Sequence, residues 1–132
     1  RNPMKLSNVV IYTRDIKRAQ DFFVEYFGAQ AGEIINDTQM NDGGKAGFVS
    51  LPEGGEILFM MRGGLTDGSA YPLHTGISSL TLATGSQEKL REITMRIYKD
   101  GYTVRNMPRS TYYGRMESVV LDFDGNLITL TV

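Results

Sequence analysis

Few side chains in this sequence are suited to acid–base or metal chemistry. There is one histidine, His74, and no cysteine, so neither a pair of imidazoles nor a thiolate cluster is available to a metal ion. His74 is a candidate proton carrier, because an unperturbed imidazole titrates at about pH 6.5. Glu56 is the second candidate, as a lone general base at the start of a predicted strand. For both residues the alternative is a solvent-exposed position without a catalytic role.

Composition and motifs exclude several other functions. No glycine-rich phosphate loop leads into a helix, and no nucleophile-elbow motif is present. A formal net charge of -1 leaves no excess of Lys and Arg to neutralise phosphates, which argues against nucleic-acid binding. No apolar run approaches the roughly 20 residues of a membrane span, and no signal-peptide pattern is visible. We therefore expect a cytoplasmic protein with no membrane partner.

Residues suited to binding a ligand alternate along four predicted strands. Successive side chains of a strand point to opposite faces, so each face can be examined separately. One face is uniformly apolar and should pack on helices: Val9, Ile11, Ile57, Phe59, Met61, Leu80, Leu82, Ile128, Leu130 and Val132. The other face mixes hydroxyl, amide, thioether and aromatic groups, as ligand cavities do, and is predicted to bind the ligand: Asn8, Val10, Tyr12, Leu58, Met60, Ser79, Thr81 and Thr129. A sheet surface that simply contacts solvent is the alternative.

A loop near residues 105–115 is a further candidate. Three arginines, at positions 105, 109 and 115, surround Tyr112 and Tyr113. Guanidinium groups there would hold a carboxylate or phosphate, and the two tyrosines would stack on a planar ligand. An ordinary charged loop is the alternative.

The elements that would position these residues follow the same order twice. The first half predicts a strand over 6–13, a helix capped by Asp15 and ended by Gly28, and strands near 31–36, 46–51 and 56–61. The second half predicts a strand over 77–84, a helix capped by Ser86 and ended by Asp100 and Gly101, and strands near 102–107, 116–123 and 127–132. A duplicated module builds one site from corresponding positions of its copies.

The two modules are joined by a segment rich in glycine. We assign residues 4–62 to the first module, 63–74 to a linker that contains His74, and 75–132 to the second module, within one structural domain. Arg1, Asn2 and Pro3 precede Met4, and we interpret them as a remnant of an expression sequence.

Three motifs in this order resemble the vicinal oxygen chelate superfamily, which includes glyoxalase I, bleomycin-resistance proteins, fosfomycin-resistance enzymes and extradiol dioxygenases. Residues 8–16 are similar to the family's opening strand and its R-D-x helix start, and residues 22–28 to its F-Y-x-x-x-L-G helix end. Residues 122–128 are similar to its D-P-D-G-N-x-I closing hairpin.

The resemblance implies an α+β fold of two βαβββ modules, whose eight strands form a curved mixed sheet around a cup with one helix behind each module. Metal-using members carry His, Gln or Glu on the first and last strand of each module. By motif these positions are Asn8, Leu58, Ser79 and Thr129, which are poor donors, so we expect no metal and no cofactor.

The function that follows is a metal-free small-molecule binding protein of the glyoxalase and bleomycin-resistance type, which sequesters or carries a hydrophobic or amphipathic ligand. The alternatives are a lactoylglutathione-lyase-like isomerase or lyase, and a degenerate module kept as a subunit or as a regulatory surface. The resemblance also implies a homodimer.

Overall fold

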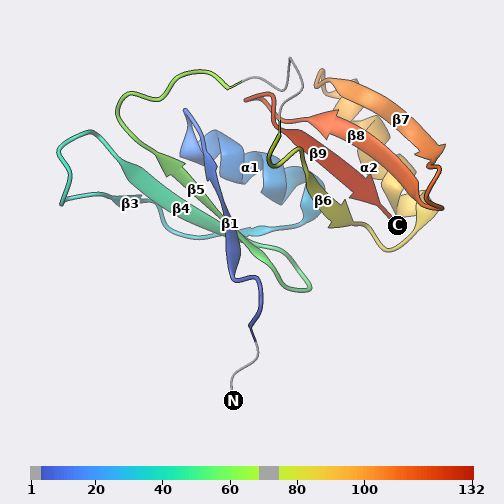
Figure 1. The fold of residues 1–132 in the computed structure, drawn as a ribbon, viewed down its shortest axis with the longest axis horizontal. Helices are drawn as coiled ribbons and strands as arrows, with labels where there is room; N and C mark the ends of the chain where they lie inside the picture. Colours follow the sequence, from blue (N-terminus) through green and yellow to red (C-terminus); the bar gives the residue numbers. More distant parts are fainter. Residues whose placement is uncertain (1–3, 69–74) are drawn as a thin grey trace. The chain divides into compact units, whose positions relative to one another are not determined.

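The computed structural model describes residues 4–68 and 75–132, which form two compact units that divide between Thr66 and Asp67 (Figure 1). This division lies within the predicted linker. Each unit contains one helix and one mixed sheet. In the described residues, no helix is long and apolar enough to cross a bilayer.

Unit 1 follows the β-α-β order that the sequence predicts. Its elements are β1 (Asn8–Tyr12), α1 (Ile16–Phe27), β2 (Gln30–Ala31), β3 (Ile35–Asn36), β4 (Lys45–Ser50) and β5 (Glu56–Met61). The strand order is β1-β5-β4-β2, with β3 also paired to β4. Strands β1 and β5 are parallel, and the other pairs are antiparallel.

Helix α1 begins and ends where its capping residues predict. The Asp15 carboxylate accepts a hydrogen bond from the Arg18 amide at 3.0 Å. Gly28 takes the left-handed conformation with φ 67°, which ends the helix at little cost for a residue without a Cβ. The helix packs on β4 and β5, where the buried Phe23 ring meets Phe59 edge-on at a centroid distance of 5.5 Å.

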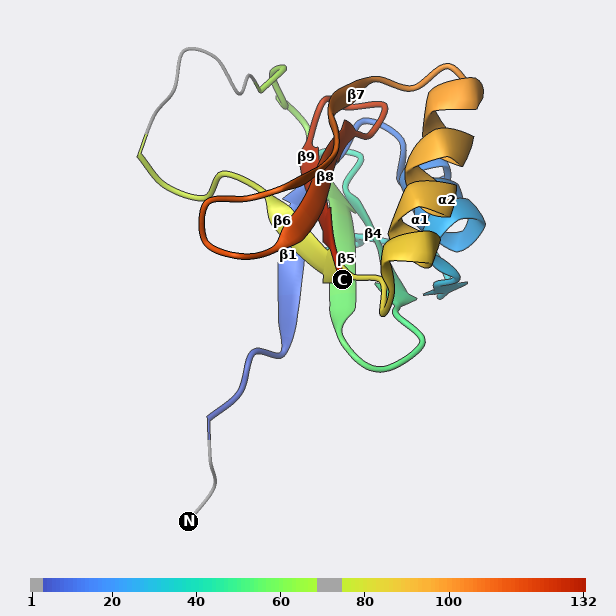
Figure 2. The ribbon, with the colours of Figure 1, turned by 90° about the vertical axis from the view of Figure 1, so that its right-hand side faces the viewer.

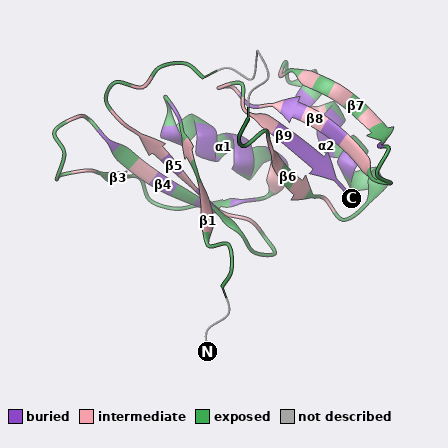
Figure 3. Cartoon of the chain, in the orientation of Figure 1, coloured by how far each residue is buried: buried purple, intermediate pink, exposed green. Residues whose placement is uncertain are grey.

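Unit 2 repeats this arrangement with a four-stranded sheet. Its elements are β6 (Leu80–Ala83), α2 (Gln87–Lys99), β7 (Val104–Ser110), β8 (Met116–Leu121) and β9 (Leu127–Thr131), in the sheet order β6-β9-β8-β7. Helix α2 lies along one side of this sheet (Figure 2). Leu90 and Ile97 of the helix, together with Val120, Ile128 and Leu130, form the core. Figure 3 shows buried residues on both helices and along β9.

The fold confirms an α+β protein of two modules, but the strands differ in detail. The described residues contain nine strands in two sheets, whereas eight were predicted. The difference arises because the predicted strand near 31–36 forms as two short strands, β2 and β3. Between these strands, the Gln20 side-chain amide of α1 donates to the backbone carbonyls of Gly32 and Phe48, at 3.0 and 2.9 Å. The Phe48 carbonyl also accepts from the Gly32 amide at 2.8 Å, so the backbone and a helix side chain share this acceptor.

Several other strand boundaries also differ from the predicted ones. Strand β7 begins at Val104 instead of Tyr102 and runs past Pro108, which an edge strand tolerates because it lacks one neighbour. Strand β6 begins at Leu80, three residues after the predicted start.

Candidate ligand-binding site

The side of the unit 1 sheet that faces away from α1, called the open face here, carries five of the predicted ligand-binding residues. Ile57 and Phe59 are buried on the α1 side, so the alternating residues Leu58 and Met60 belong to the open face. The pairing register then places three rows of side chains across the open face: Asn8, Glu56 and Ser50; Val10, Leu58 and Phe48; and Tyr12, Met60 and Ala46. The register also resolves β4, whose sequence is apolar on both sides.

Large apolar side chains of the open face are exposed. Val10 is 51% exposed, Tyr12 58% and Phe48 41%. Ile35 of β3, which pairs with Ala46, adds a further exposed apolar residue. Contiguous exposed apolar residues on a sheet mark a binding surface more often than isolated ones do.

A row of polar side chains borders this apolar area. Asn8 of β1 and Ser50 of β4 both lie directly opposite Glu56 of β5. Among the strand residues of the open face, Glu56 is the only carboxylate, and it is exposed. The predicted position of Glu56 on the ligand side of its strand therefore agrees with the register.

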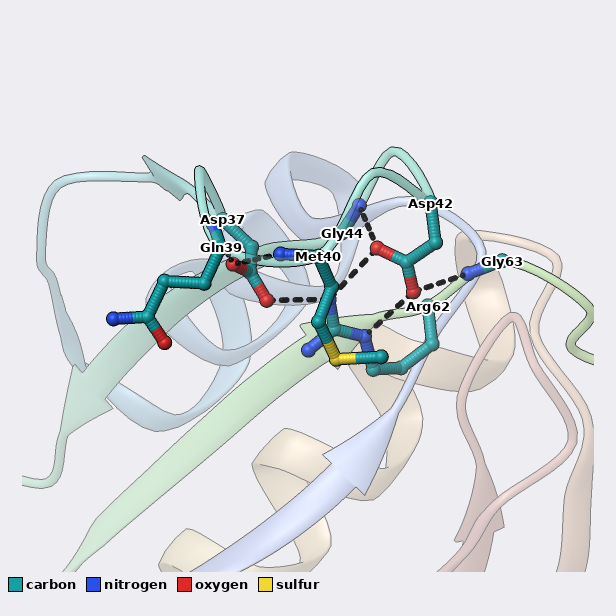
Figure 4. Close-up of polar contacts among 7 residues, drawn as sticks. All are labelled: Asp37, Gln39, Met40, Asp42, Gly44, Arg62 and Gly63. Atoms are coloured by element: carbon teal, nitrogen blue, oxygen red, sulfur yellow. Dashed lines mark hydrogen bonds and ion pairs between the residues drawn. The ribbon is translucent and has the colours of Figure 1, made fainter.

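An ionic cluster at the end of β5 was not predicted from the sequence (Figure 4). The Arg62 Nη2 atom donates to Asp37 Oδ2 at 2.6 Å and to Asp42 Oδ1 at 2.8 Å, and Arg62 Nε donates to Asp42 Oδ2 at 3.1 Å. The amides of Gly44 and Gly63 also donate to the Asp42 carboxylate. The cluster ties the loop between β3 and β4 to the end of β5, and its residues are 20 and 25 positions apart, a separation that no periodic pattern connects.

These contacts change the acidity of both carboxyl groups. Hydrogen bonds from Arg62, and then from the Gly63 amide, lower the pKa of Asp42 to about 2. The Arg62 hydrogen bond and the amides of Gln39 and Met40 lower the pKa of Asp37, while the two carboxylates raise the pKa of Arg62. All three groups are therefore ionised at neutral pH.

The lowered pKa of Asp42 predicts a dependence of stability on pH. A carboxyl group whose pKa is lower in the folded than in the unfolded chain stabilises the fold above its unfolded pKa of about 4 and loses this effect as the pH falls toward 2. We expect Asp42→Asn to be less stable than the wild-type chain at pH 7, and this difference to shrink below pH of about 4. The urea midpoint measured across this range checks the prediction.

The control is Asp21→Asn, which removes an exposed Asp21–Lys17 pair from α1. It should change stability little at any pH in this range, because exposed helix pairs contribute little. An Asp42→Asn difference that does not vary with pH would contradict the stabilising role of the ionised cluster.

A cavity of about 170 Å³ lies beside the ionic cluster. Its lining residues come from β3, β4, β5 and the adjoining loops: Ile35, Asn36, Asp37, Lys45, Ala46, Met60 and Arg62. Met60 and Ala46 also belong to the third row of the open face. The cavity is therefore continuous with the open face.

In unit 2, two of the predicted binding residues bond to each other. The hydroxyl groups of Ser79 and Thr129 lie 3.0 Å apart and share a hydrogen bond. Thr129 is only 8% exposed, whereas Thr81, which lies opposite it on the neighbouring strand β6, is exposed. The Thr129 hydroxyl thus already has a partner within unit 2.

The predicted tyrosines lie in the turn between β7 and β8. Tyr112 is fully exposed, and the Tyr113 hydroxyl donates to Glu117 Oε1 at 2.6 Å, which raises the pKa of Tyr113. The turn is closed by a backbone hydrogen bond from the Thr111 amide to the Arg115 carbonyl. His74, the other catalytic candidate, lies outside the described residues.

The residues at the family's metal positions do not fit a divalent ion. Leu58 has no donor atom, Asn8 offers a neutral amide, and the hydroxyls of Ser79 and Thr129 bond to each other. Zinc, nickel, iron and manganese sites use imidazole, thiolate or carboxylate donors. In residues 4–68 and 75–132, no group of three or more His, Cys, Asp or Glu side chains could hold a metal ion.

The paired βαβ modules place this protein in the class of two-module α+β domains. A family model of the Glyoxalase/Bleomycin resistance protein/Dioxygenase superfamily matches residues 5–130, so the chain belongs to this family. A search of curated protein sequences finds no significant match.

Solved structures share the fold at low sequence identity. A glyoxylase/bleomycin resistance protein/dioxygenase domain from Frankia sp. EAN1pec has 14% identity and a TM-score of 0.82, covering 99% of this chain and 98% of that one. A glyoxalase family protein from Bacillus cereus has 16% identity and a TM-score of 0.82, with 99% and 95% covered. Glyoxalase I from Zea mays has 15% identity and a TM-score of 0.76, with 96% of this chain but 44% of that chain covered. These likenesses establish the fold.

Proposed function

We propose that this protein binds a small hydrophobic or amphipathic molecule on the open face of unit 1 without a metal ion. The observation that carries the proposal is the apolar row in which Val10 and Phe48 are exposed on either side of half-buried Leu58, together with exposed Tyr12 in the next row. Apolar walls bordered by a few polar groups are typical of ligand sites. Asn8 and Ser50 would orient a polar part of the ligand at the border of the apolar area.

Substitution of Phe48 tests this site. We expect the neutral dye N-phenyl-1-naphthylamine to bind saturably, with a rise in fluorescence, and Phe48→Ala to weaken its binding about tenfold because an aromatic contact and its buried area are lost. Tyr98→Ala is the matched control, since Tyr98 is a half-exposed aromatic residue of α2 in unit 2. Equal dye affinities of Phe48→Ala and the wild-type chain would place the site elsewhere.

Metal analysis tests the second part of the proposal. We expect purified and dialysed protein to contain less than stoichiometric Zn, Ni, Fe and Mn, and dye binding to be unchanged by a chelator. Stoichiometric, tightly bound metal would overturn the metal-free proposal, because the donors at Asn8, Leu58, Ser79 and Thr129 do not account for it.

An isomerase or lyase is the second candidate function, and one observation favours it. Glu56 is exposed on the open face beside Asn8, where a carboxylate could remove a proton from a bound substrate. The hemithioacetal of methylglyoxal and glutathione is the substrate to assay. Turnover by the wild-type chain that is lost in Glu56→Gln, with dye binding retained, would favour the enzyme over the binding protein. The homodimer stays a prediction, which sedimentation velocity tests.

A further inference from the structure

We propose that the cavity beside Arg62 receives an uncharged hydrogen-bond acceptor, a carbonyl, amide or sulfoxide oxygen, at one end of the ligand on the open face. This inference rests on the proposed function, because the cavity would hold only part of that ligand. It assigns a chemical class to the polar end of the ligand and names the donor that binds it.

The donor is the Nη1 amino group of Arg62. Both Nη2 contacts and the Nε contact of the guanidinium go to Asp37 and Asp42, as the dashed lines of Figure 4 show. Nη1 has no acceptor in the described part of the chain. Because the guanidinium is planar and its Nε–Nη2 edge is held by Asp42, Nη1 is directed away from that carboxylate. Two N–H donors on a fixed group are thus available to a ligand oxygen.

The charges around the cavity favour a neutral acceptor over an anion. Asp37, Arg62 and Lys45 line the cavity, and Asp42 is paired with Arg62 beside it, so two negative and two positive charges leave no net excess to attract a carboxylate. The Asp37 carboxylate is itself part of the cavity lining and would repel an anion placed there. A neutral oxygen accepts from Nη1 without this repulsion.

The size of the cavity limits what enters it. Its volume of about 170 Å³ corresponds to roughly five or six water molecules at about 30 Å³ each, which is smaller than a whole-ligand pocket. Met60 and Ala46 belong both to the cavity and to the open face, so a polar end inside the cavity leads directly to an apolar body on the open face, near Tyr12.

Three small probes of similar size distinguish this inference from the proposed function. Acetophenone carries a neutral carbonyl, benzoate a carboxylate, and ethylbenzene no acceptor. In protein labelled with ¹³C at the methionine methyl groups, we expect the Met60 signal, assigned with Met60→Leu, to shift with all probes that bind. Acetophenone should bind at least about tenfold more tightly than ethylbenzene, because it gains one hydrogen bond to a charged donor, and benzoate should bind no better than ethylbenzene.

The results with the three probes show whether the Arg62 inference fails alone or together with the proposed function. Equal affinities for acetophenone and ethylbenzene, or tighter binding of benzoate, would overturn the inference about Arg62 while leaving a binding site on the open face. Failure of all three probes to bind would overturn both. Selective binding of acetophenone that shifts Met60 supports both.

Variants test the cavity itself. Ala46→Met should fill the cavity and remove the preference for acetophenone, whereas Ala31→Met, on exposed β2 of the same sheet but outside the cavity lining, should leave it unchanged. Arg62→Lys keeps a positive charge between the carboxylates but removes the planar pair of N–H donors, and should also abolish the preference. An unchanged preference in Ala46→Met, whose ionic cluster is intact, would overturn the inference.

Discussion

Phe23→Ala is expected to destabilise unit 1 by about 3–5 kcal/mol, the usual cost of truncating a buried aromatic residue in a packed core. Phe23 is 1% exposed, and the centroid of its ring lies 5.5 Å from that of Phe59 in β5. Because the Phe23 ring packs on Phe59, the substitution leaves a cavity directly behind the open face. Chemical denaturation in guanidinium, monitored by circular dichroism, measures the loss.

Val24→Ala is the matched control on the same helix. Val24 is partly exposed, and its truncation should change stability by no more than about 0.5 kcal/mol. Phe23→Ala should also weaken binding of the naphthylamine dye, since Leu58 and Met60 flank Phe59 on the opposite side of β5. A Phe23→Ala variant as stable as Val24→Ala would show that the packing of Phe23 on Phe59 does not hold unit 1 together.

Gly47→Ala is expected to cost about 2–6 kcal/mol, although it adds a single methyl group. A Cβ atom at Gly47 would lie 2.8 Å from Gln20 Nε2 and 3.0 Å from Ile16 Cγ2, so the Gln20 amide would have to leave its place and Ile16 of α1 would have to shift slightly. Overpacking of this kind costs roughly 1–3 kcal/mol. Displacing Gln20 would also remove its bonds to the Gly32 and Phe48 carbonyls, at a further cost of about 1–3 kcal/mol.

Gly32→Ala is the matched control, because it makes the same change in the same unit. A Cβ atom at Gly32 would meet the Phe48 carbonyl oxygen at 3.5 Å, an ordinary van der Waals distance. Equal urea midpoints for the two variants would contradict the close approach of α1 to β4 at Gly47. A loss confined to Gly47→Ala would establish that this glycine sets the distance between the helix and the sheet.

The closing hairpin of unit 2 forms at residues 122–128, where its motif is found in the sequence. The Asp122 carboxylate holds the turn: it accepts from the amides of Asp124 and Asn126 and from the Asn126 side chain. Burial raises the pKa of Asp122, and these hydrogen bonds oppose that effect.

The sequence by itself determined the class of fold and the sides of most strands. Helix caps at Asp15, Gly28 and Ser86 act through neighbours within a few residues, so their effect is visible in a short stretch of chain. The buried face of β5 follows from its alternation, because Ile57 and Phe59 are buried on one side of the strand. The same logic assigned Leu58 and Met60 to the open face. In β9 alternation is not sufficient, since Thr129 and Thr131 are buried as well as Ile128 and Leu130.

Only the tertiary structure decided the ionic cluster, the cavity and the partner of Thr129. Arg62 meets Asp37 and Asp42 because β4 and β5 pair in one particular register, and no local pattern encodes a contact between residues 20 or more positions apart. The Ser79–Thr129 bond likewise joins residues 50 positions apart. Caps and alternation are properties of neighbouring residues, whereas register and long-range polar contacts form only when the whole sheet assembles.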